Sequence, residues 1–279
     1  MRPGGGSPTS RVTNGDAEEE TVSTQIQDER NKWLRRYGPA PDAAPRLVCF
    51  PHAGGSASWF HPLSGALAPE VAVVAVQYPG RQDRRAEQPL QSVEELADRI
   101  APLLAEPGGP LLFFGHSMGA AVAFEVARRL VEAGHPGPQH FFASGRRAPG
   151  RTRDETVHLM SDRGLLAEVV ALGGTDPKSL GDEDLIAMVL PPMRADYRAI
   201  ETYRCAPGEP LRCPVTVLTG DADPKTSLDE ARAWNEYTSA VCDVQVFRGG
   251  HFFIVDHQAE IEDLVRDVAK QLVPIARST

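Results

Sequence analysis

The sequence lacks the features that mark secreted, membrane-spanning or nucleic-acid-binding proteins. Its four cysteines form no Cys-x-x-Cys pair and no Cys/His spacing typical of a metal site. No apolar run approaches the roughly 20 residues of a membrane helix, and no apolar stretch of a secretory signal follows Arg2. The formal net charge of -9 disfavours nucleic acid, because phosphate binding requires a basic face. We therefore expect a cytoplasmic protein with reduced, mostly buried thiols and no membrane or nucleic-acid partner.

What the sequence does contain fits one globular domain. Its 279 residues are 41% hydrophobic and 24% charged, which is enough for an α/β domain with a well-buried core. Residues 1–30 differ, because they begin with a Gly-Gly-Gly-Ser-Pro run, carry an acidic run at 18–20 and have almost nothing to bury. We predict a disordered N-terminal tail over residues 1–30 and a single folded domain over residues 31–279.

Short apolar segments alternate with helical patterns from residue 46 onward. The candidate strands are 47–50, 71–76, 111–114, 140–143, 215–218 and 244–247, and the candidate helices are 93–104, 118–132, 229–238 and 258–272. Strands that are apolar on both faces are typical of a sheet covered by helices on each side. The alternation predicts the α/β class, with a mostly parallel, doubly wound sheet.

Residues 150–210 interrupt this alternation. They contain no convincing strand but do contain helical stretches at 164–171 and 182–188. Such an insertion between two strands is typical of a helical lid over an active site. The alternative is an ordinary helical excursion that has no gating role.

The segment 111–120 carries the clearest chemical motif. It reads as a strand, then Gly-x-Ser-x-Gly around Ser117, then a helix. The two glycines permit a tight strand-to-helix turn that exposes the serine hydroxyl at a helix N-terminus. We predict that Ser117 is a catalytic nucleophile and that the N–H of Met118 is one donor to the oxyanion.

A serine nucleophile needs a base and an acid that orients the base. Among eight histidines, His251 follows the last candidate strand on a Gly-Gly loop, whereas His257 suits a surface or capping role and His116 a packing role. Asp221 and Asp223 both follow the candidate strand 215–218, and Asp221, nearer the strand, suits a bracing role. Serine, aspartate and histidine then occur in the order of the α/β-hydrolase fold.

The second oxyanion donor is expected from an early loop. The segment His52-Ala53-Gly54-Gly55 follows the first clear strand, and Ala53 is the candidate donor. The alternative is that the two glycines simply make a tight turn.

Taken together, these motifs resemble the type II thioesterases that accompany polyketide synthases and nonribosomal peptide synthetases, members of the α/β-hydrolase superfamily. The resemblance runs from about residue 33 to residue 256, and the N-terminal tail lies outside it. It is carried, in order, by Trp-Leu-Arg-Arg at 33–36, the early loop at 50–56, Tyr-Pro-Gly-Arg at 78–81, Gly-His-Ser-Met-Gly-Ala at 115–120, Ala-Phe-Glu at 123–125, Leu-Pro-Pro-Met-Arg-Ala-Asp-Tyr at 190–197, the segment 220–224, Trp234 and Gly-Gly-His-Phe-Phe at 249–253.

This resemblance implies a catalytic triad of Ser117, Asp223 and His251, and it is the main reason to favour Asp223 over Asp221. It also implies an editing enzyme that hydrolyses aberrant or stalled acyl groups from the phosphopantetheine arm of carrier proteins in antibiotic-type biosynthesis. No metal or other cofactor is required, and we expect a monomer. In the predicted lid, Met193 and Tyr197 are candidate substrate contacts.

Two arginine clusters follow predicted strand ends and could dock an acidic carrier protein. The candidate docking residues are Arg84, Arg85, Arg146 and Arg147, and the alternative is that they are solvated loop charges. Other functions also stay open: a product-releasing thioesterase, a general acyl esterase, or a non-catalytic carrier-binding module. A malonyl-type acyltransferase shares Gly-His-Ser-x-Gly but is not expected to carry an aspartate and a histidine on successive strand-end loops.

Overall fold

The computed structural model describes residue 24 and residues 27–105, 108–174 and 182–273. Within this part of the chain one sheet contains β1 (Leu34–Arg36), β2 (Arg46–Phe50), β3 (Ala72–Val76), β4 (Leu111–His116), β5 (His140–Ser144), β6 (Val215–Gly220) and β7 (Cys242–Phe247). Their order is β1-β3-β2-β4-β5-β6-β7, and only β1 runs antiparallel to its neighbour. The predicted class, an α/β fold with a mostly parallel doubly wound sheet, is confirmed.

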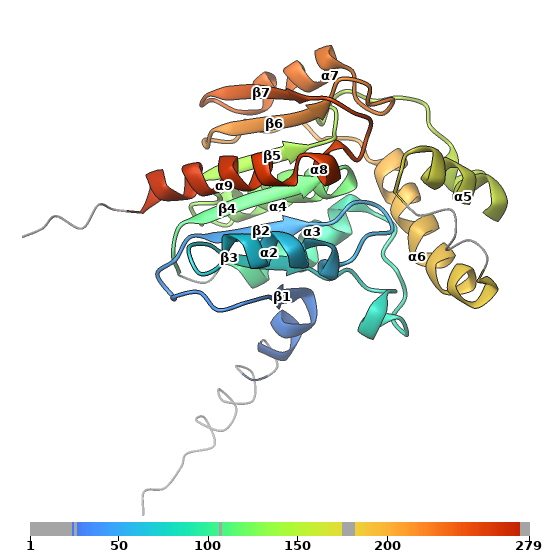
Figure 1. The fold of residues 1–279 in the computed structure, drawn as a ribbon, viewed down its shortest axis with the longest axis horizontal. Coiled ribbons are helices and arrows are strands. Elements are labelled where there is room, and N and C mark those ends of the chain that lie inside the picture. The colour runs from blue at the N-terminus through green and yellow to red at the C-terminus, as the bar shows by residue number, and fades with distance from the viewer. Residues whose placement is uncertain (1–23, 25–26, 106–107, 175–181, 274–279) are drawn as a thin grey trace, which may run out of the picture.

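Helices cover both faces of the sheet (Figure 1). One face packs against α2 (His61–Leu67) and α9 (Gln258–Leu272), and the other against α3 (Val93–Leu104) and α4 (Met118–Glu132). Successive strand residues serve opposite cores: Phe113 joins the α3/α4 core, whereas Phe114 joins the α2/α9 core. This alternation is why the strands are apolar on both faces.

Most predicted elements coincide with observed ones. The predicted helices 93–104, 118–132 and 258–272 have the bounds of α3, α4 and α9. The predicted helix 229–238 is instead α7 (Leu228–Arg232) followed by the 3-10 helix η5 (Ala233–Tyr237), and α7 begins at a capping box between Ser227 and Glu230. Strand β1, which was not predicted, is three residues long and pairs Leu34 with Val76 at the sheet edge.

The predicted N-terminal boundary requires a correction. Residues 27–33 are helical and lead directly into β1, although residues 27–30 were assigned to the disordered tail. Trp33, at the end of this helix, is buried in the α3/α4 core, which accounts for the order that precedes β1. The remainder of the predicted tail lies outside the described residues, apart from residue 24.

The segment 150–210 forms a helical layer beyond one end of the sheet (Figure 1). It contains the 3-10 helix η3 (Val157–Leu159), α5 (Asp162–Ala171) and α6 (Glu183–Thr202), and no strand among its described residues. Helix α6 extends well past the predicted stretch 182–188 and continues through Pro191 and Pro192. Elsewhere, the described residues also form the shorter elements η1 (Ala57–Phe60), η2 (Gln82–Arg84) and α8 (Phe253–Asp256). A gating role for the helical segment 150–210 stays a prediction.

Candidate active site

Ser117 lies on a sharp turn between β4 and α4. Its backbone has φ 55° and ψ -118°, a left-handed conformation that is uncommon for a residue with a side chain. The flanking glycines are required by close approach: a Cβ on Gly115 would lie 2.4 Å from the carbonyl oxygen of Gly119, and one on Gly119 would lie 1.9 Å from that of Phe50. The sequence therefore folds locally into a strained strand-to-helix turn, which is the geometry expected for a serine nucleophile.

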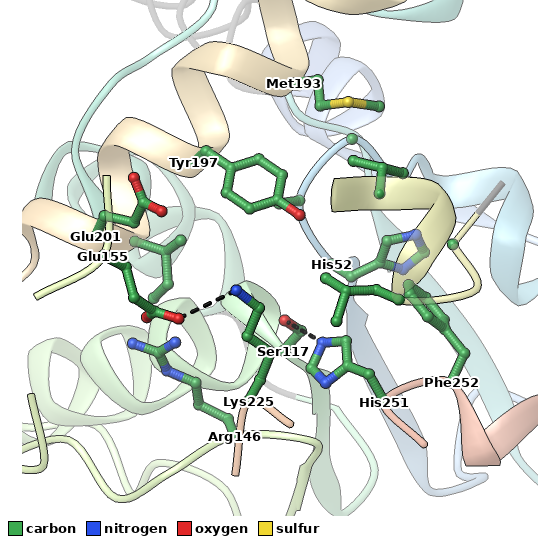
Figure 2. Close-up of a pocket in the computed structure, with 16 residues that line it drawn as sticks. His52, Ser117, Arg146, Glu155, Met193, Tyr197, Glu201, Lys225, His251 and Phe252 are labelled. Atoms are coloured by element: carbon green, nitrogen blue, oxygen red, sulfur yellow. Dashed lines mark hydrogen bonds and ion pairs between the residues drawn. The ribbon is translucent and has the colours of Figure 1, made fainter. Parts of the chain in front are cut away.

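Three predicted site residues meet at this turn. The Oγ of Ser117 lies 2.9 Å from Nε2 of His251, and Nδ1 of His251 lies 3.0 and 3.1 Å from the two carboxylate oxygens of Asp223. Asp223 follows β6 and His251 follows β7, so parallel strands bring both to one edge of the sheet. His251 and Asp223 are buried, whereas Ser117 is half-buried and faces a pocket (Figure 2). This arrangement can carry a proton from the serine to the imidazole.

Asp221 occupies a different place from Asp223. Its Oδ1 accepts a hydrogen bond of 2.8 Å from the N–H of Gly249, on the loop that precedes His251. The side chain is exposed, and it ties the end of β6 to the Gly-Gly loop. This contact agrees with the bracing role predicted for Asp221.

The other candidate histidines do not contact Ser117 in this way. His116 is fully buried, and its Nδ1 lies 2.9 Å from the Oγ of Ser144. Burial holds the pKa of His116 well below its usual range, and burial lowers the pKa of His52 to about 3, so both imidazoles are neutral. His257 lies at the start of α9 and bonds the carboxylate of Glu260. His116 and His257 thus have the packing and surface positions expected of them.

The early loop and the segment 150–210 line the same pocket as Ser117. Ala53 and Gly54 line it beside Met193 of α6, and the ring of Tyr197, also on α6, points into the pocket on the side opposite Ser117 (Figure 2). Ala53, Met193 and Tyr197, all predicted as site residues, therefore lie in the same pocket as Ser117. Met118 directly follows it as the first residue of α4.

The pocket also has a charged wall that sequence reasoning missed. Arg146, Glu155, Glu201 and Lys225 line it beside Ser117 (Figure 2). The Nζ of Lys225 lies 3.1 Å from Glu155 and 2.6 Å from Glu168 of α5. Burial, with Arg147 alongside, lowers the pKa of Arg146 to about 9, so this side chain is still charged near neutral pH. Two positions could have indicated this wall: Lys225, two residues after Asp223, and Arg146, two residues after the end of β5.

Two of the four predicted docking arginines require correction. Arg84 is only 5% exposed; it donates to Glu87 and to the carbonyl of Gln77, and it lies over the ring of Trp33. Arg147 is only 2% exposed and is bonded to Glu155 and to backbone carbonyls. Neither guanidinium is available to a partner, so the prediction was wrong for both.

The other two arginines differ from each other. Arg146 lines the pocket that holds Ser117 and does not belong to an outer surface (Figure 2). Arg85 is exposed just past the carboxyl end of β3. A docking role therefore stays a prediction for Arg85.

A family model described as the thioesterase domain matches residues 45–272. The chain belongs to this thioesterase family. It is 50% identical over 252 residues to the probable cadicidin biosynthesis thioesterase of Streptomyces griseus, covering 90% of this chain and 69% of that protein. It is also 49% identical over 238 residues to thioesterase PikA5 of Streptomyces venezuelae, covering 84% of each.

Solved structures give the same result. The type II thioesterase BorB from the borrelidin biosynthetic cluster is 49% identical, with a TM-score of 0.80, and the match covers 85% of this chain and 97% of that chain. YbtT, a type II thioesterase from the yersiniabactin pathway, is 31% identical with a TM-score of 0.75, covering 86% of this chain and 98% of that chain. The predicted resemblance to type II thioesterases is confirmed by these matches.

No described helix is long and apolar enough to cross a membrane. Among the same residues, no group of three or more histidine, cysteine, aspartate or glutamate side chains is placed to hold a metal ion.

Proposed function

We propose that this thioesterase is a serine enzyme that hydrolyses aberrant or stalled acyl groups from the phosphopantetheine arm of carrier proteins in polyketide or nonribosomal peptide biosynthesis. The observation that carries the proposal is the chain of contacts from Ser117 through His251 to Asp223, at 2.9 to 3.1 Å, in a member of the thioesterase family. The relatives named for such pathways support the choice of substrate.

In the first half of the reaction, the Oγ of Ser117 attacks the thioester carbonyl while Nε2 of His251 takes the hydroxyl proton. Asp223 accepts from Nδ1 of His251, which fixes the tautomer and stabilises the imidazolium that forms. The backbone N–H groups of Ala53 and Met118 donate hydrogen bonds to the carbonyl oxygen as it becomes negatively charged. The C–S bond then breaks, and the pantetheine thiolate takes the proton from His251.

In the second half, water attacks the acyl-serine ester while His251 again serves as base. The C–O bond to Ser117 breaks, the free acid leaves, and the serine recovers its proton. A thiol with a pKa of ~8.5 is a far better leaving group than an alcohol. Protonated His251 therefore does not need to be a strong acid when the thiolate leaves in the first half. Attack of water on the acyl-serine ester, in the second half, is the more demanding of the two steps.

One assay separates the proposal from its alternatives. The purified chain is incubated with an acyl carrier protein loaded with a short acyl group, with the matching acyl-CoA, and with a nitrophenyl ester, and the products are identified. We expect the highest kcat/KM on the carrier and a free acid as product. A preference for the nitrophenyl ester would indicate a general esterase, a cyclic product from a full-length chain would indicate a product-releasing enzyme, and binding without turnover would indicate a carrier-binding module.

The contacts of α6 predict an effect on acyl-chain selectivity. Replacing Met193 or Tyr197 with alanine removes apolar surface that lines the same pocket as Ser117. We expect kcat/KM for long acyl thioesters to change by about tenfold or more, while that for acetyl thioesters changes little, because pocket contacts discriminate methylenes at this scale. Met188→Ala is the matched control, because Met188 is exposed on the same helix. Equal changes at every chain length would exclude a role in acyl-chain selectivity.

The exposed Arg85 predicts an effect limited to carrier-bound substrates. We expect Arg85→Glu to lower kcat/KM on an acyl carrier protein by about three- to tenfold at low salt, through a slower encounter with an acidic partner. Turnover of an N-acetylcysteamine thioester should stay unchanged, and the effect should shrink as salt is added. Arg212→Glu is the control, because Arg212 is exposed just before β6, at the opposite end of the sheet. Equal losses on both substrates would count against docking.

A further inference from the structure

The early loop, residues 52–55, contacts two side chains that are far from it in the sequence. The Oδ2 of Asp196, on α6, accepts a hydrogen bond of 2.8 Å from the N–H of Gly54. Arg81 donates to both carboxylate oxygens of Asp196, at 2.7 and 2.9 Å, and its Nη1 also donates to the carbonyl of Gly55 at 2.9 Å. The loop is therefore held from outside at two adjacent residues, by two side chains that also bind each other.

The third restraint on this loop is internal. The N–H of Gly55 donates to the carbonyl of His52 at 2.9 Å. This carbonyl belongs to the same planar peptide as the N–H of Ala53, so fixing one end of the peptide fixes the direction of the other. Gly54, in between, has φ +77°, and a Cβ there would lie 3.0 Å from Cε of Met193. Helix α6 thus packs directly on the turn that carries the Ala53 N–H.

Stability alone is a weak explanation for the ion pair. Asp196 is fully buried and Arg81 is 7% exposed. Removing two charges from water is costly, and buried pairs are often no more stabilising than apolar residues of the same volume. The pair does supply a strong, directional acceptor and donor at the loop that an apolar pair could not supply.

We propose that Asp196, held by Arg81, is a positioning residue that orients the Ala53 N–H toward the oxyanion formed at Ser117. The inference rests on the proposed function, because it requires Ala53 to serve as an oxyanion donor. Through Asp196 alone, α6 would then position an oxyanion donor in addition to lining the pocket. The same set of contacts also links three segments that the sequence analysis singled out separately, 52–55, 78–81 and 190–197, because each contributes a residue to it.

A matched pair of double variants isolates the contact with Gly54. Arg81→Met/Asp196→Leu removes both charges and leaves the Gly54 N–H without an acceptor. Arg81→Met/Asp196→Asn also removes both charges but retains a carboxamide oxygen that can accept from Gly54. We expect the leucine variant to show a kcat about 10- to 100-fold below that of the asparagine variant, with KM within about threefold, since misplacing an oxyanion donor acts on the transition state.

Two measurements accompany kcat on an N-acetylcysteamine thioester: the thermal unfolding midpoint and the rate at which a fluorophosphonate labels Ser117. The labelling rate should fall in parallel with kcat, because that reaction also places a developing oxyanion near Ser117. Arg198→Ala serves as control, because Arg198 is exposed on the same helix, and both rates should match those of the wild type. Equal kcat and equal labelling rates for the two folded double variants would overturn the proposal.

Two further outcomes are informative. If the leucine variant does not fold, Arg81→Met/Asp196→Ala takes its place, because it also lacks an acceptor for the Gly54 N–H, and its kcat should again lie about 10- to 100-fold below that of the asparagine variant. A kcat loss that follows the loss of stability would instead assign Asp196 a structural role. If the wild type labels with fluorophosphonate but hydrolyses no thioester, the proposed function fails, and the labelling rates still test the positioning of the loop.

Discussion

Replacing Ser117 with alanine is expected to lower kcat for thioester hydrolysis by about four to six orders of magnitude, the scale seen when a serine nucleophile is removed from a triad. Without Oγ, no acyl-enzyme can form, and His251 has no hydroxyl to deprotonate. Folding should be unaffected within about 0.5 kcal/mol, because alanine and serine both carry a Cβ and bear the same strain at φ 55°. The measurement is single-turnover hydrolysis of an acyl carrier protein, with urea unfolding alongside.

Contaminating hydrolases are the main source of error in this experiment. A fluorophosphonate should label the wild type at one site and leave Ser117→Ala unlabelled, which identifies the nucleophile independently of turnover. If Ser117→Ala retained more than about 1% of the wild-type rate in a preparation free of other labelled proteins, the nucleophile would have to be assigned elsewhere.

The sheet and most helices could be predicted because their signals are local. Strands such as β4 are apolar on both faces and end at glycine-rich turns, and α3, α4 and α9 show regular helical patterns. The place of Ser117 between a strand and a helix was predicted because its motif needs both, and the structure has both. His251 and the two aspartates follow from their places at strand ends, where parallel strands converge on one edge.

What could not be predicted depends on contacts between distant residues. Arg84 and Arg147 were interpreted as surface charges, but each finds its partners through the fold: Arg147 bonds the backbone of Lys225, and Arg84 covers Trp33. The link between Arg81 and Asp196 joins positions 115 residues apart, which no local pattern encodes. Strand β1 was missed because three residues with one buried leucine give too short an alternation.

The second large effect is expected at Asp223. Replacing it with asparagine should lower kcat by about 10⁴-fold with little change in volume. In the wild type, the Asp223 carboxylate accepts from Nδ1 of His251 through both oxygens and from the N–H of Lys225 at 2.8 Å. A carboxamide would instead donate to Nδ1, which leaves the proton on Nε2. His251 would then face the Oγ of Ser117 with a donor and could not take its proton.

Asp221→Asn is the matched control, because it makes the same chemical change two residues away. Asp221 accepts from the N–H of Gly249, and an asparagine oxygen can keep that bond, so kcat should stay within about threefold of the wild type and the loss should appear mainly in stability. Both variants are compared by kcat on one thioester and by urea unfolding. A 10⁴-fold loss at Asp221 with little loss at Asp223 would reverse the assignment of the acid. Small losses at both would mean that His251 acts as base without a carboxylate.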